Sequence, residues 1–314
     1  MLLLADLDHW KQKFEFGILL PLLSRLPLWM GDPLSRIRGI FHALLGFDWR
    51  AKALGMNYVK KQTYKAMGIM SPENSTLKKK ILTWQRFIYN SKEEWQAGLF
   101  AHIAVMKHIA GKSKIESLDI LLKNQRKGQG QVLISCHFDS FCLGMVLMGM
   151  QGLHINVVNT SDIEDQRIHP TVRSFFQTKY INMEKLINGR MPYYQKEMSY
   201  FYHVLDKGEI VTLMGDIPGG KSDIIIPFLG TKFKLPLGAW HMAKETGSLI
   251  GGYMVVQKGL GSYHVVSYPP VEIDQTDPYK TLIPIYNFME RWIKKMPQRW
   301  ISADLLPGYD NVRQ

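Results

Sequence analysis

Residues 131–150, QVLISCHFDSFCLGMVLMGM, determine the fold class. The run Gln131–Cys136 is apolar and rich in branched residues, and it follows a glycine turn at 128–130, which predicts a buried strand. A short loop then leads to the uncharged run 141–150, which predicts a buried helix. A buried strand followed by a buried helix is typical of a parallel sheet with both faces covered.

The same alternation continues to the end of the chain. Further strands are predicted at 154–159, 209–214, 223–230, 248–256 and 263–273, and helices at 170–180, 193–207, 235–246 and 279–295. Gly247 directly follows one of these helices and is a usual helix stop. We therefore predict an α/β fold with a mixed, mainly parallel sheet flanked by helices, in which chemistry collects beyond the carboxyl ends of the strands.

The N-terminal part has a different texture. Residues 1–127 read mostly as helix, so we expect an N-terminal helical region followed by one continuous α/β core at 128–314. Between 14 and 50, leucines and aromatics alternate with arginines, and prolines divide the segment into short helices. Such helices suit the interface of an anionic membrane, or they form a layer packed on the core. The uncharged run 16–24 is too short to span a bilayer, which takes about 20 residues.

The composition restricts the partners. Lys and Arg number 39 against 27 Asp and Glu, which gives a net charge of +12. This balance favours an acidic partner, which could be nucleic acid, an anionic lipid surface or an acidic protein. The two cysteines, Cys136 and Cys142, form no disulfide framework, so a reducing, cytoplasmic location is expected.

One motif suggests nucleotide binding and is rejected. Residues 215–222, GDIPGGKS, match the phosphate-loop pattern, but such a loop must open a helix. The following residues are β-branched and include Pro227, and proline inside a helix costs about 3 kcal/mol. We interpret the motif as a turn between strands with an exposed Lys221.

His137 is the main catalytic candidate. It lies at the carboxyl end of the first predicted strand, where a general base can meet substrate. Asp139 or Ser140 is a plausible N-cap of the helix that follows, and the N-terminus of that helix could supply N–H groups to an oxyanion. The alternative is a structural histidine, which is the more common role of a lone imidazole. The other histidines are scattered, and no metal-ligand spacing occurs.

From these residues outward, the chain resembles the secondary lipid A (lauroyl/myristoyl) acyltransferases of the lysophospholipid acyltransferase superfamily. The resemblance is carried in register by segments between about residues 15 and 295, namely the His-Phe-x₄-Leu-Gly motif at 137–144 and the segments 211–216, 226–230, 235–252 and 264–272. It implies a glycerol-3-phosphate acyltransferase-like fold and an acyltransferase located at the cytoplasmic face of the inner membrane. An acyl carrier protein or CoA thioester would be co-substrate, with no other cofactor. The net charge of +12 suits the acidic carrier protein and an anionic membrane surface, and we expect these partners rather than nucleic acid.

The sequence departs from the family at the acid of the motif. Five positions after His137, where the family has Asp or Glu, this chain has Cys142. Asp139 could orient the imidazole instead. Alternatively, His137 could work unassisted or with a carboxylate from elsewhere such as Asp216. Cys142 could also act as a nucleophile through a thioester. Finally, the domain could be a non-catalytic acyl-carrier- or lipid-binding module.

The resemblance implies two further roles. Asp216 would order the acceptor site, and a cation of the helix after His169, either Arg173 or Lys179, would assist. The family's basic C-terminal ending is replaced by Trp300–Asp304, so the acceptor is left open as a lipid or a secondary metabolite, acylated on a hydroxyl or an amine. Ser140 is assigned to substrate binding, and methionines after the motif could line an acyl channel.

Overall fold

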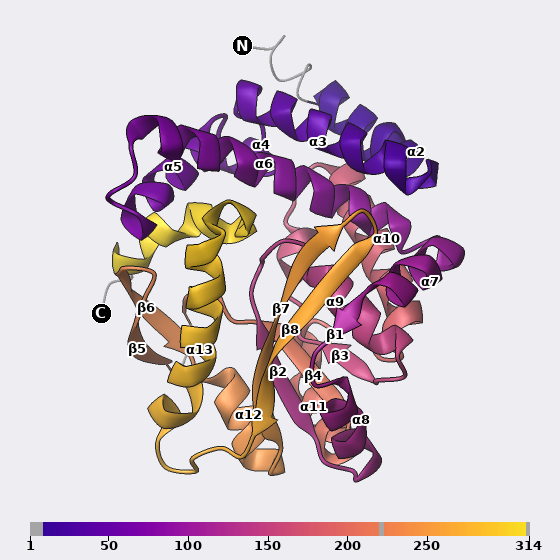
Figure 1. The fold of residues 1–314 in the computed structure, drawn as a ribbon, viewed down its shortest axis with the longest axis vertical. Coiled ribbons are helices and arrows are strands. Elements are labelled where there is room, and N and C mark those ends of the chain that lie inside the picture. The colour runs from indigo at the N-terminus through magenta and orange to yellow at the C-terminus, as the bar shows by residue number, and fades with distance from the viewer. Residues whose placement is uncertain (1–8, 220–222, 312–314) are drawn as a thin grey trace.

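A six-stranded mixed sheet forms the centre of the molecule in a computed structural model that describes residues 9–219 and 223–311 (Figure 1). The strand order is β1-β8-β7-β2-β4-β3, and every neighbouring pair is parallel except β7 with β8. The strands are β1 (Lys114–Ile115), β2 (Gln131–Ser135), β3 (Ile155–Val157), β4 (Ile210–Met214), β7 (Leu249–Gly259) and β8 (Ser262–Val271). The predicted α/β class with a mainly parallel sheet is confirmed.

Helices cover both faces of this sheet because its strands alternate their side chains. Val132 and Ile134 of β2 join one apolar cluster, while Leu133 between them joins the other. The first cluster contains the helices α11 (Tyr194–Asp206), α12 (Gly238–Thr246) and α13 (Pro278–Lys295). The second contains α7 (Ile103–Lys112), α8 (Leu118–Arg126), α9 (Phe141–Met150) and α10 (Pro170–Ile187). The period-2 alternation of strands therefore builds two cores.

The N-terminal helices form a layer across one end of the sheet (Figure 1). They are η1 (Glu15–Leu19), α2 (Leu20–Arg25), α3 (Leu28–Leu45), α4 (Ala51–Leu54), α5 (Tyr58–Met70) and α6 (Thr76–Leu99). The Ser75 side chain caps α6 by accepting a hydrogen bond from the Lys78 backbone N–H. The edge strand β1 comes from the part of the chain before residue 128 and pairs with β8. The division at 127/128 thus stays a prediction.

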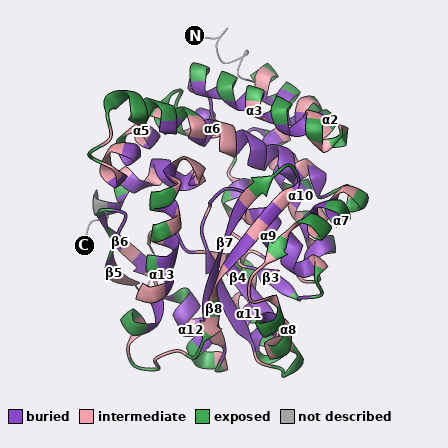
Figure 2. Ribbon diagram, viewed as in Figure 1, coloured by how far each residue is buried: buried purple, intermediate pink, exposed green. Residues whose placement is uncertain are grey.

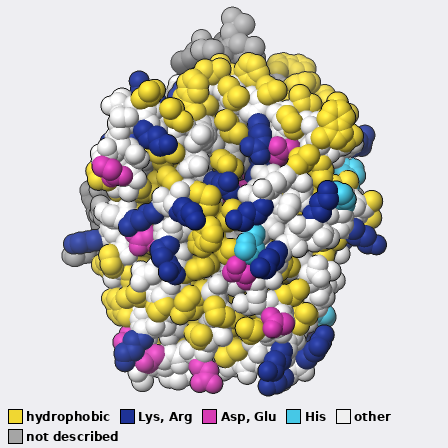
Figure 3. All heavy atoms as spheres, viewed as in Figure 1, with side chains coloured by type: hydrophobic (Ala, Val, Ile, Leu, Met, Phe, Trp, Pro, Cys, Tyr) yellow, Lys and Arg dark blue, Asp and Glu magenta, His cyan; other side chains and the backbone are white. Residues whose placement is uncertain are grey.

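Helix α3 is amphipathic, but its polar side is buried and its apolar side is exposed. Its buried residues are small or polar: Gly31, Asp32, Ser35, Arg38, Gly39, His42 and Ala43. Its exposed residues are large and apolar: Trp29, Leu34, Ile37, Ile40, Phe41, Leu44 and Leu45. Figure 2 shows the exposed outer side of this layer, and Figure 3 shows apolar side chains gathered at the same end of the molecule. No helix among the described residues is long and apolar enough to cross a membrane.

A separate hairpin replaces part of a predicted helix. Strands β5 (Asp223–Phe228) and β6 (Thr231–Pro236) pair antiparallel through a turn in which Leu229 and Gly230 both have positive φ. The helix expected from 235 therefore begins only at Gly238. Lys221 and Ser222 of the phosphate-loop-like motif lie outside the described residues, and the element that follows them is strand β5 rather than a helix.

The last described element completes the fold around the sheet end. After α13 the chain continues in two 3-10 helices, η3 (Pro297–Arg299) and η4 (Ile301–Asn311). A further 3-10 helix, η2 (Ser161–Glu164), lies between β3 and α10. Arg86 of α6 is fully buried and donates hydrogen bonds to the Ile301 carbonyl at 2.5 and 2.9 Å. The C-terminal segment is thereby fixed against the N-terminal helical layer.

Candidate active site

His137 and Asp216 meet at the carboxyl edge of the sheet. Strands β2 and β4 are parallel neighbours in which Ser135 pairs with Met214, and each functional residue lies two positions beyond that pair. The His137 Nδ1 atom is 2.8 Å from Asp216 Oδ1, and the His137 backbone N–H donates to Oδ2 at 3.0 Å. Parallel pairing thus brings together two residues that are far apart in sequence.

Asp216 is fully buried and its carboxylate is held on both oxygens. In addition to the two bonds from His137, Oδ2 accepts a hydrogen bond from the indole Nε1 of Trp300 at 2.8 Å. Burial tends to raise the pKa of Asp216, but the nearby His137 and the hydrogen bonds from His137 and Trp300 outweigh it and lower the pKa below its ordinary value. The carboxylate is therefore ionised and can hold the imidazole in one orientation.

The imidazole of His137 remains accessible. Its side chain is 27% exposed, and its ring packs edge-on against Phe141 with 4.8 Å between ring centroids. With Nδ1 on Asp216, the proton-accepting position is Nε2, and no described residue hydrogen-bonds that atom. This is the arrangement required of a general base whose second nitrogen is fixed by a carboxylate.

Asp139 is buried and its carboxylate is bound to other residues. It lies 2.5 Å from Lys92 Nζ and 2.7 Å from Arg299 Nη1, and it accepts a hydrogen bond from the Gln257 backbone at 3.0 Å. Its backbone has a φ of 51°, an uncommon conformation for a residue with a side chain. The structure brings Asp216, and not Asp139, to the imidazole.

Ser140 occupies the N-cap position of α9 without capping it through its side chain. The side chain is buried, and Oγ donates to Asp139 Oδ1 at 3.1 Å. Neither Asp139 nor Ser140 therefore caps the helix through its side chain, and the assignment of Ser140 to substrate binding stays a prediction.

Cys142 is buried next to an ion pair that sequence reasoning missed. Glu93 Oε1 of α6 lies 2.6 Å from Lys179 Nζ of α10, and both side chains interact with the thiol. Burial raises the pKa of Cys142 to about 12. Glu93 belongs to a run of three charged residues, 92–94, which are all buried. In sequence such a run is indistinguishable from a solvated helix face, so no signal identified it.

The two candidate cations on α10 have different surroundings. Lys179 is buried, and its Nζ lies 5.5 Å from the ring centre of Phe141, the ring that contacts His137. Arg173 donates to the backbone carbonyl of Glu164 at 3.4 Å. Lys179 is therefore the cation that the structure places in the surroundings of His137.

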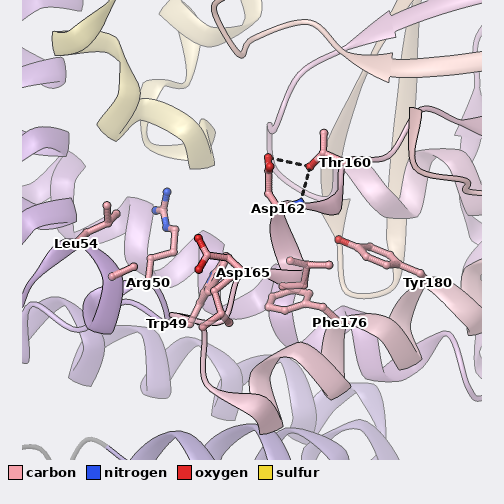
Figure 4. A pocket seen from close by; sticks show the side chains of 11 residues that line it. Trp49, Arg50, Leu54, Thr160, Asp162, Asp165, Phe176 and Tyr180 are labelled. Atoms are coloured by element: carbon pink, nitrogen blue, oxygen red, sulfur yellow. Dashed lines mark hydrogen bonds between the residues drawn. The ribbon is translucent and has the colours of Figure 1, made fainter. Parts of the chain in front are cut away.

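A cavity of about 280 Å³ opens at the same edge of the sheet (Figure 4). Phe176 and Tyr180, which flank Lys179 on α10, point into it, and Trp49 packs on Phe176 with 5.2 Å between centroids. The remaining lining residues are Arg50, Ala53, Leu54, Thr160, Asp162, Ile163, Asp165 and Ile168. The walls are mostly apolar. The methionines expected to line a channel do not contribute, and Met145 and Met148 are buried in the core instead.

Among residues 9–219 and 223–311, no group of three or more His, Cys, Asp or Glu side chains is arranged to hold a metal ion.

These features agree with the comparison with known families. The model of the bacterial lipid A biosynthesis acyltransferases matches residues 93–302, which include β1, the His137 loop, Asp216 and Trp300. The chain belongs to this family. No curated protein matches the chain. Family membership supports acyltransferase activity in general and leaves the acyl donor and the acceptor open.

Proposed function

We propose that the protein transfers a fatty or related acyl group from an acyl carrier protein or CoA thioester to a hydroxyl or amine of a lipid or secondary-metabolite acceptor, with His137 as general base. The observation that carries the proposal is the 2.8 Å hydrogen bond between His137 Nδ1 and the buried Asp216 carboxylate. It supplies the orienting acid that the motif lacks at position 142. The second nitrogen, Nε2, has no hydrogen-bond partner among the described residues, and the side chain is partly exposed.

The proposed reaction has two proton transfers. His137 Nε2 removes the proton from the acceptor hydroxyl or amine as the oxygen or nitrogen attacks the thioester carbonyl carbon. The tetrahedral intermediate then collapses, its carbon–sulfur bond breaks, and the imidazolium returns the proton to the leaving thiolate. Asp216 stabilises the imidazolium between these steps, as the acid of a catalytic triad does. A thioester is already activated, so the proposed chemistry needs no further cofactor.

Two features support stabilisation of the oxyanion. The N-terminus of α9 begins at Phe141, four residues after His137, and carries the positive end of a helix dipole. The ammonium of the buried Lys179 lies 5.5 Å from the centre of the Phe141 ring, which His137 also contacts. A positive field from both would favour charge that develops on the carbonyl oxygen.

The apolar cavity of Figure 4 is the proposed site of the acyl chain. It is lined mostly by aromatic and aliphatic side chains, two of which lie close to Lys179 on α10, and its polar lining residues are Arg50, Thr160, Asp162 and Asp165. Burial of a hydrocarbon chain against such walls is favourable by roughly 0.8 kcal/mol per CH₂ group.

The proposed partners are an acidic acyl carrier protein and an anionic membrane surface on the cytoplasmic side of the inner membrane, where the protein would be peripheral. The net charge of +12 favours both partners. Helix α3 exposes its large apolar side chains, and this favours its insertion at the lipid interface.

The test is transfer of a radiolabelled acyl group from a panel of carrier-protein and CoA thioesters of different length to a bacterial lipid extract, with the product identified by mass. We expect His137→Ala to abolish transfer and Asp216→Asn to lower kcat by about three to four orders of magnitude, as in related triads. Carrier binding should persist in both. Transfer by His137→Ala at the wild-type rate would exclude His137 as the base. Carrier binding without transfer by the wild type would instead favour the non-catalytic module.

A further inference from the structure

The C-terminal segment 299–301 pairs with the loop that carries His137. The Asp139 N–H donates to the Arg299 carbonyl at 2.7 Å, and the Ile301 N–H donates to the His137 carbonyl at 2.7 Å. Between these bonds, Phe138 and Trp300 form an antiparallel bridge. The loop that carries His137 is thus hydrogen-bonded on either side of Phe138 to a segment that lies about half the chain length later in the sequence.

The indole of Trp300 reaches from this segment to the catalytic carboxylate. It is fully buried, and its Nε1 donates to Asp216 Oδ2 at 2.8 Å. The same oxygen accepts the His137 backbone N–H, while Oδ1 faces His137 Nδ1. Rotation of the carboxylate would break at least one of these three bonds, so the indole helps to fix which oxygen meets the imidazole.

We propose that Trp300 is a positioning residue for acyl transfer, and that its indole N–H sets both the orientation and the basicity of Asp216. This inference rests on the proposed role of His137 as base. An additional N–H donor shares the negative charge of the carboxylate, so less of that charge is available to stabilise the imidazolium. Phenylalanine could fill much of the same space but could not donate a hydrogen bond.

The other titratable groups that face Asp216 do not change charge near neutral pH. They are Cys136 at the end of β2, Tyr286 of α13 and Tyr309 of η4. Burial and the nearby Asp216 raise the pKa of each well above its ordinary value. Lys179, which lies beyond Phe141, is paired with Glu93. These groups would therefore not produce an acid limb near neutral pH.

The test is the pH dependence of kcat/KM for Trp300→Phe, measured with the thioester that the donor panel selects and with the same lipid extract. Without the indole donor, Asp216 holds the imidazolium more strongly, so the neutral base forms only at higher pH. We expect the acid limb to move up by about half to one pH unit. We also expect kcat on the plateau to fall about tenfold, with KM for the donor unchanged.

A control and a double variant separate positioning from structure. Trp292 of α13 is half-buried and makes no described hydrogen bond to the site, so Trp292→Phe should leave the acid limb unchanged. In an Asp216→Asn background the carboxylate is absent, so Trp300→Phe should have little additional effect on kcat. Thermal unfolding of every variant records loss of packing independently.

An unshifted acid limb in Trp300→Phe, or an equal loss of kcat with and without the Asp216 carboxylate, would overturn the proposal and leave Trp300 a packing residue. Full activity of His137→Ala would be a different result, because it would remove the base itself. The two failures are therefore distinguishable.

Discussion

At the residue scale, the reactivity of the Cys142 thiol decides between two possible chemical mechanisms. A direct mechanism needs only His137 and Asp216, whereas a two-step mechanism would pass the acyl group through Cys142. A nucleophilic cysteine is activated by a lowered pKa in an accessible, electropositive environment. Cys142 is buried, and burial raises its pKa to about 12. At that pKa, fewer than about one Cys142 thiol in ten thousand is ionised at neutral pH.

We therefore expect Cys142→Ser to retain transfer within about threefold of the wild-type rate, because serine keeps the small polar shape beside Lys179. The measurement is the steady-state rate together with intact-protein mass during turnover. An acyl adduct on Cys142, combined with loss of transfer in the serine variant, would instead establish the two-step route.

The residues of the site differ in how far the sequence could predict them. His137 was predicted because it follows a recognisable strand, whereas Asp216 was named from the resemblance to a family whose corresponding strand ends in an aspartate. Which carboxylate contacts the imidazole depends on the neighbouring positions of β2 and β4, and strand order cannot be read from periodicity. Trp300 and Glu93 reach the site from an irregular segment and from a helix whose charged run is buried, so they carried no local signal.

At the scale of elements, strong local sequence patterns were sufficient to predict helices and strands, and weak patterns were not. The helix α9 and the strands β2 and β4 were predicted within one or two residues because each is uniformly apolar and bounded by turns. Strand β1 has two residues, which is too short for any pattern. The hairpin β5–β6 extends into a predicted helix because its alternation depends on packing against α13 and η4 rather than on propensity.

The contact between α3 and α6 allows a precise test of packing. At Gly39, an added Cβ would lie 2.5 Å from the backbone Cα of Ile88, which cannot move without shifting α6. Gly111 in α7 is a matched control, because an added Cβ there meets nothing within 4 Å. We expect Gly39→Ala to lower the free energy of unfolding by about 1–3 kcal/mol.

Gly111→Ala should be neutral or stabilising by up to about 1 kcal/mol, because alanine favours a helix more than glycine does. Chemical denaturation of both variants is the measurement. Equal stability of the two variants would show that α3 and α6 are not packed as closely as the structure has them.

At the scale of the whole molecule, the position of the site relative to the N-terminal layer connects the proposed chemistry to a membrane. The layer lies at the carboxyl end of the sheet, because Lys92 of α6 contacts Asp139, two residues after His137. The buried side of α3 is held to α6 by polar contacts, including Arg38 Nη1 to Glu94 Oε2 at 2.6 Å. The apolar side of α3 therefore faces outward on the same layer that covers the site.

This arrangement predicts that exposed apolar residues of α3 bind an anionic bilayer. Trp29 and Phe41 are 67% and 58% exposed, and insertion of either side chain is favourable by roughly 1.5–3 kcal/mol. We expect Trp29→Ser/Phe41→Ser to weaken binding to phosphatidylglycerol vesicles at least tenfold in co-sedimentation. Ile225→Ser on β5 is the control, because this residue is 53% exposed on a hairpin away from α3 (Figure 1). Equal binding by both variants and the wild type would exclude α3 as the membrane-binding surface.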